Sequence, residues 1–185
     1  MSNGMRTVLL AAVASCTLFA ACRKDPDPAQ LTAVDQLISA TDAALLTLNE
    51  LDRGRYQRSD SLYHMQAGLF RGRFADTLAP AEAKMLGDQY ITLRAADHMG
   101  DDHERILADI ATSTERLRAL RSDLAASAID QEDGTSLITA EQRRHIELIE
   151  GVHGIIDNYR MLQKAWDRRD SVALLLSDSL IRAPR

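Results

Sequence analysis

The sequence predicts an all-α protein, an antiparallel up-down-up bundle of three long helices. Only four prolines occur in 185 residues, at positions 26, 28, 80 and 184. Because proline costs about 3 kcal/mol inside a helix, this placement leaves two long stretches open to helix formation. Apolar residues recur at steps of three and four in both stretches, with no competing strand-like alternation. Short turns between helices make sequential helices antiparallel neighbours.

The first 25 residues form a segment of their own. Arg6 is followed by the uncharged run 7–21, and then by Cys22 and the charged residues 23–25. A basic start, an apolar run of this length and small residues before a cleavage point are typical of a secretory signal peptide. The run is too short to span a bilayer. We therefore expect a signal peptide at 1–21, followed by a body outside the cytoplasm.

Residues 18–22, Leu-Phe-Ala-Ala-Cys, resemble the lipobox of bacterial lipoproteins. The resemblance implies that Cys22 becomes the first residue of the mature chain and carries acyl chains that anchor it in a membrane. Cys16 is a second candidate, but cleavage there would leave an unusually short apolar run upstream. Arg23 stands where the family's inner-membrane proteins carry aspartate, which implies the outer membrane, facing either side. The alternatives are an ordinary secreted protein and an uncleaved N-terminal anchor.

Composition limits the function of the body. The chain has a net charge of −5 and no cluster of basic residues, so we expect no nucleic-acid partner. Its two cysteines, Cys16 and Cys22, both lie in the N-terminal segment, which excludes a disulfide or a thiolate metal site in the body. Aromatic residues make up only 4% of the chain. The core must therefore consist mainly of leucine, isoleucine and alanine.

The first helix is expected over 28–76, after a lipidated tether at 22–27. Asp27 has the character of an N-cap, Pro28 suits the first helical position, and Gln30 completes a capping box. The polar stretch 52–58, with Gly54 in its middle, interrupts the apolar stripe. A break there would turn the fold into a four-helix bundle.

The second helix is expected over 80–128, with Pro80 at its first position. Residues 130–136, which contain Asp133-Gly134, have the chemistry of a turn. Thr139 then begins a second capping box that opens the third helix. This helix ends before Pro184, so the bundle domain covers 28–183.

Folding the chain about turns near residues 78 and 134 predicts a polar layer across the middle of the bundle. Residues 96–104 would lie level with 53–60 and with about 164–171, where all three helices lose their apolar pattern. We interpret the layer as ion pairs that fix the register of the helices. The alternative is a small pocket for a ligand or metal, with the following candidate residues: His98, Asp101, Asp102, His103, Arg168 and Arg169.

A metal ion or other cofactor is not expected in this layer. His98 and His103 differ by about 140° around a helix, so they point to different faces and cannot chelate one ion together. The sequence also contains no phosphate-binding glycine loop, no Gly-x-Ser-x-Gly and no His-Glu-x-x-His. We therefore expect a protein that is not an enzyme.

Two further resemblances concern function. Residues 93–103 are similar to the second helix of small all-helical lipoproteins of Gram-negative envelopes, which have no assigned activity. Residues 138–142 resemble the Leu-Thr-x-x-Gln motif of periplasmic stress chaperones. The resulting hypothesis is a membrane-anchored spacer or adaptor that contacts envelope proteins through its helix faces. The alternatives are a periplasmic ligand- or metal-binding bundle and an envelope stress chaperone or inhibitor.

Overall fold

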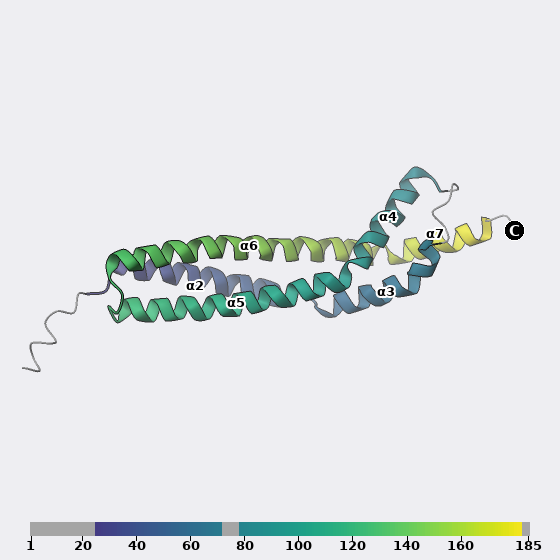
Figure 1. The fold of residues 1–185 in the computed structure, drawn as a ribbon. Coiled ribbons are helices and arrows are strands. Elements are labelled where there is room, and N and C mark those ends of the chain that lie inside the picture. The colour runs from purple at the N-terminus through teal and green to yellow at the C-terminus, as the bar shows by residue number, and fades with distance from the viewer. Residues whose placement is uncertain (1–24, 72–77, 183–185) are drawn as a thin grey trace, which may run out of the picture.

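The computed structural model describes residues 25–71 and 78–182, and this part of the chain is helical without any strand (Figure 1). The all-α class is therefore confirmed. The predicted signal peptide at 1–21, Cys22 and Cys16 lie outside the described residues. None of the described helices is both long enough and apolar enough to cross a membrane.

The described residues form six helices where the sequence predicted three or four. In chain order they are α2 (Pro28–Asn49), α3 (Gly54–Arg71), α4 (Pro80–Arg94), α5 (Ala96–Ala125), α6 (Gln131–Asp167) and α7 (Arg169–Arg182). The predicted break near Gly54 is present, because α2 ends at Asn49 and α3 begins at Gly54. Two further breaks, each a single residue long, occur at Ala95 and Arg168. Each predicted long helix is thus divided in two.

The starts of α2 and α4 agree with the prediction. The Asp27 carboxylate accepts a hydrogen bond from the backbone N–H of Ala29 at 2.9 Å, and Pro28 occupies the first turn. Pro80 likewise begins α4, where the N–H of Ala79 donates to Glu82. Each N-cap arrangement satisfies an N–H group that the helix itself leaves without a partner.

The turn between α5 and α6 lies earlier than predicted. The N–H of Ala128 donates to the Asp123 carbonyl and that of Ser127 to the Leu124 carbonyl, which is a Schellman ending. Asp130 is the N-cap of α6, and its carboxylate accepts from the N–H of Asp133. The predicted turn at 130–136 is therefore wrong.

The predicted capping box at Thr139 is wrong for the same reason. Thr139 lies inside α6, and its hydroxyl donates to the carbonyl of Thr135. The prediction that Gln30 completes a capping box in its own helix is also wrong. The Gln30 side-chain amide instead donates to two groups of α6, the carbonyl of Gln131 at 2.8 Å and the hydroxyl of Thr135 at 3.0 Å.

Helices α2, α5 and α6 pack against one another in pairs and form the long part of the molecule, whereas α3, α4 and α7 lie towards its other end (Figure 1). Asp35 of α2 pairs with Arg121 near the end of α5, and Arg53, just after α2, pairs with Glu104 near the start of α5. These pairs show α2 and α5 running in opposite directions. They also match the predicted pairing of the first two helical segments.

The core consists of four buried clusters spaced along this length. The cluster beside the α5–α6 turn contains Val34, Leu117, Leu120, Leu124 and Ile138. The central cluster contains Ala44, Leu48, Ile106, Ile110, Val152 and Ile155. Beyond the break between α2 and α3, a third cluster contains Tyr56, Leu93, Ala96, Met99, Leu162 and Ala165. The far-end cluster contains Leu86, Val172 and Leu176. Buried residues therefore lie on both sides of each of the three helix breaks.

Candidate functional site

A buried pair, Tyr56 and His103, lies next to the break between α2 and α3. Tyr56 is on the first turn of α3 and His103 is on α5, and their side chains are 5% and 1% exposed. The Tyr56 hydroxyl lies 3.1 Å from His103 Nδ1, and the two rings meet edge to face. Tyr159 of α6 also meets the Tyr56 ring edge to face, at 6.0 Å between ring centroids. Side chains from three helices therefore meet at Tyr56.

Both groups of the pair are held in their neutral forms. Burial lowers the pKa of His103, Arg53 lowers it further, and Glu104 and the backbone of Leu48 oppose the shift. Burial and the neighbouring Tyr159 raise the pKa of Tyr56 to about 12. A neutral histidine whose Nδ1 accepts from the tyrosine hydroxyl carries its proton on Nε2. This Nε2 forms no hydrogen bond of ordinary geometry with any described residue.

The arrangement of Tyr56 and His103 suits a structural role, holding two helices together, better than a role in acid–base catalysis. Neither side chain leaves an open face for a substrate, since both are almost fully buried. The hydrogen bond fixes the start of α3 against α5, next to the break between α2 and α3. His103, one of the candidate residues of the predicted layer, therefore lies in the interior, where it pairs with a tyrosine.

The prediction that residues 53–60 lie level with 96–104 is confirmed, since Arg53 pairs with Glu104 and Tyr56 with His103. The other five candidate residues form no hydrogen bond or ion pair with His103 in the described part of the chain. His98 and Asp101 are exposed, and Asp102 pairs with Arg105 on its own helix at 2.9 Å. No group of three or more histidine, cysteine, aspartate or glutamate side chains that could hold a metal ion is found in the described ranges.

Arg168 and Arg169 lie nearer the far end of the molecule. Arg168 Nε donates to the Lys164 carbonyl, and Arg169 Nη1 donates to the Trp166 carbonyl. At this level α6 faces α4, since the Gln89 amide donates to the Ala165 carbonyl at 2.8 Å. The predicted juxtaposition of these arginines with residues 96–104 is wrong.

This error follows from the misplaced turn. Because the chain turns between Ala125 and Gln131 and not near residue 134, each residue of α6 lies opposite a part of α5 that is roughly three helical turns from the predicted one. Observed contacts between α5 and α6 confirm the shift: Arg116 pairs with Glu141, and Gly151 lies against Ile106.

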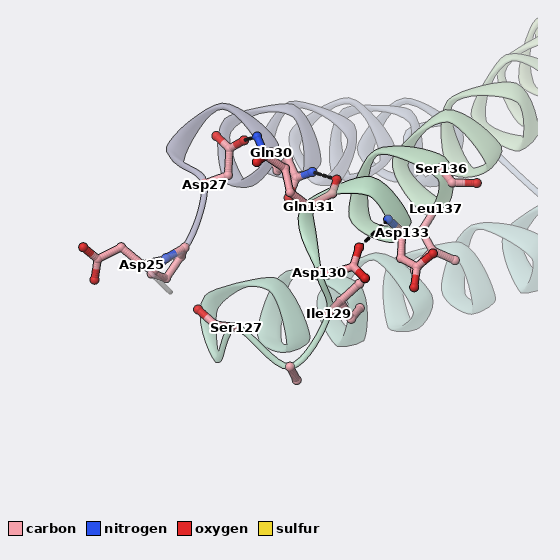
Figure 2. A pocket seen from close by; sticks show the side chains of 12 residues that line it. Asp25, Asp27, Gln30, Ser127, Ile129, Asp130, Gln131, Asp133, Ser136 and Leu137 are labelled. Carbon is pink, nitrogen blue, oxygen red and sulfur yellow. Dashed lines mark hydrogen bonds between the residues drawn. The ribbon is translucent and has the colours of Figure 1, made fainter. Parts of the chain in front are cut away.

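A hollow of about 800 Å³ lies at the end of the molecule where the chain enters α2 (Figure 2). Its lining comes from residues 25–27, the α5–α6 turn and the first turns of α6. Two of its carboxylates, Asp27 and Asp130, serve as helix N-caps, and Asp27 also accepts from the Gln131 amide at 2.8 Å. Gln30 also lines this hollow. Its position in the sequence is typical of a residue that caps its own helix, so the sequence does not reveal that its side chain contacts α6.

Comparison with known proteins gives no further guidance. No protein family matches the chain, and neither does any curated protein or solved structure. The function must therefore be argued from the geometry and from the sequence patterns.

Proposed function

We propose that the chain is a lipid-anchored helical protein of the bacterial cell envelope, which acts as a spacer or adaptor and not as an enzyme. The lipobox-like residues 18–22 support the anchor, with Cys22 as the lipidated residue and the outer membrane as its location. The adaptor role is supported mainly by the position of residues 25–27, where the chain enters the helical body at one of its ends.

The chain enters the body at one end of an elongated structure. Residues 25–27 lie beside the α5–α6 turn, whereas α3, α4 and α7 lie towards the opposite end (Figures 1 and 2). From this turn α6 continues for 37 residues, which corresponds to about 55 Å. An anchor at Cys22, only three residues before Asp25, would hold the turn close to the membrane and direct the other end away from it.

In this proposal the six helices act as three arms in an up-down-up arrangement: α2 with α3, α4 with α5, and α6 with α7. The opposite directions of α2 and α5, together with the short breaks inside each arm, support this grouping. Each far-end helix also exposes a large apolar side chain: Met65 on α3, Ile91 on α4 and Leu174 on α7. These are the positions at which an envelope partner would meet the body.

Replacing Cys22 tests the anchor. In cells that express the full chain, Cys22→Ser should move the protein from the membrane fraction to the soluble fraction and abolish labelling by a palmitate analogue. Cys16→Ser, the matched control, should change neither result. Membrane retention of the Cys22→Ser protein, or loss of labelling in the control alone, would refute the assignment of Cys22.

Cross-linking in the intact envelope tests the adaptor role. A photoreactive residue at Ile91, near the far end, should give a defined adduct with an envelope protein. The matched position Ile146, which is also exposed but lies in the part of α6 nearer the α5–α6 turn, should not give that adduct. Absence of any adduct at Ile91, or the same adduct at both positions, would contradict a far-end partner site.

A further inference from the structure

The single tryptophan of the chain contacts two arginines that come from other helices. Trp166 is in the last turn of α6, Arg55 is on the first turn of α3, and Arg169 is the first residue of α7. The guanidinium carbons of Arg55 and Arg169 are 5.4 Å and 4.9 Å from the centroid of the indole. Three helices thus bring two positive charges to one aromatic ring.

The two arginines differ in how their charges are balanced. Arg169 donates to the Trp166 carbonyl at 3.0 Å and lies 3.6 Å from the carboxylate of Asp170, whose side chain is 82% exposed. Arg55 has no carboxylate partner among the described residues, and its Nε is buried without a hydrogen bond. Its neighbours do have such partners, since Arg53 pairs with Glu104 and Arg58 with Asp52.

Without a bound ligand, this arrangement of two arginines carries an unfavourable free energy. Two like charges at one ring repel each other, and a buried N–H group without an acceptor loses free energy that water would otherwise supply. The net charge of −5 makes an excess of basic residues at this place a local feature and not a consequence of composition. An anion at the site would reduce both costs.

The cation–π contact with the indole also holds the Arg55 guanidinium in place for an anion. Such a contact uses the π face of the ring and forms no hydrogen bond, so it leaves the N–H groups of the guanidinium available as donors. An oxyanion such as phosphate or carboxylate matches these donors in charge and in planar geometry. We propose that Arg55, Trp166 and Arg169 form a binding site for the oxyanion group of a ligand. This site does not depend on the lipid anchor.

Tryptophan fluorescence provides a direct test, because Trp166 is the only tryptophan in the chain. The full-length protein in mild detergent is titrated with inorganic phosphate, acetate and tetraglutamate, each against sodium chloride at equal ionic strength. We expect a saturable change in emission with at least one of these probes. Phosphate alone would identify a phosphate site, whereas acetate or tetraglutamate would identify a carboxylate site.

Two variants make the test specific. Arg55→Gln removes one of the two positive charges at the site and should weaken the apparent affinity about tenfold or more, as expected for the loss of a charge-assisted hydrogen bond. Arg58→Gln, on the same helix but paired with Asp52 and without a contact to the indole among the cation–π contacts of the described residues, is the matched control and should bind as the parent does. Circular dichroism shows whether each variant keeps its helical content. No saturable response beyond chloride, or a response that Arg55→Gln leaves unchanged, would overturn the proposal.

Discussion

Gly134 shows how closely the start of α6 packs against the rest of the body. A Cβ atom at this position would lie 2.8 Å from Gln30 Oε1, 2.9 Å from Leu124 Cδ2 and 3.0 Å from Gln30 Nε2. Gly134→Ala therefore forces Gln30, Leu124 or both to move. Gln30 is 8% exposed and Leu124 4%, so neither has free space to enter.

The contacts of these two side chains give the magnitude. Moving Gln30 breaks its hydrogen bonds to the Gln131 carbonyl and the Thr135 hydroxyl, which are worth about 1 kcal/mol each. Displacing Leu124 in its cluster costs about 1 kcal/mol more. Alanine in place of glycine returns up to about 1 kcal/mol through its helix propensity. We therefore expect Gly134→Ala to lower the free energy of unfolding by about 1–2 kcal/mol.

Gly154 is the matched control, because it lies in the same helix and a Cβ atom added to it would meet nothing within 4 Å. There the same substitution should raise the stability by up to about 1 kcal/mol. Urea unfolding followed by circular dichroism measures both changes, and each kcal/mol corresponds to about 2–4 °C in Tm for a chain of this size. In a Gln30→Ala background the cost of Gly134→Ala should shrink, since one of the two obstacles is gone. If both glycine substitutions stabilise the protein equally, the close packing that we infer is refuted.

Two further predictions concern the turn and the buried histidine. Ser127 has φ +50°, so Ser127→Gly should raise the free energy of unfolding by up to about 1 kcal/mol in urea titrations. Ser122→Gly, inside α5, should lower it by about 0.5 kcal/mol; a fall in both variants would contradict the left-handed assignment. Because burial and Arg53 lower the pKa of His103 from 6.5, the unfolded chain binds a proton below about pH 6.5 that the folded chain resists. Stability should therefore be complete above that pH and decrease as the pH falls below about 6.5. His103→Gln should reduce this decrease, and His145, whose pKa burial also lowers, should account for part of what remains. An unchanged profile in His103→Gln would contradict the assignment to His103.

The spacing of apolar residues in the second predicted helix, 80–128, correctly indicated which face of it is buried. Leu93, Ile110 and Leu117 are at most 1% exposed, as their spacing indicated. The break at Ala95 does not disturb this pattern, because its φ of −85° and ψ of −2° stay close to the helical region. The break at Arg168 has nearly the same angles. Such breaks require neither glycine nor proline, so the sequence contains no local pattern that reveals them.

The start of α6 was predicted wrongly because residues 130–134 suit both a turn and the first turn of a helix. An Asp-Gly pair favours a turn, whereas Asp130 three residues before Asp133 also suits an N-cap. The structure adopts the N-cap, and Gly134 then serves the close approach of Gln30 and Leu124. Only tertiary packing decides between these uses. The displaced turn moved Arg168 away from the level at which the sequence placed it.

The partner of His103 could not have been found from periodicity. In an unbroken first helix, Tyr56 would lie about 80° around the axis from Leu48, away from the centre of the apolar stripe. Because the helix is interrupted at residues 50–53, the side chains of α3 point in directions that do not follow from the periodicity of α2. Tyr56 then faces His103, with its hydroxyl 3.1 Å from Nδ1. Gly100 lies against this ring, with its Cβ position 3.4 Å from Tyr56 Cβ, so a larger residue there would press on the pair. The break in the first arm is thus the condition for the buried pair, and the two features must be lost or kept together.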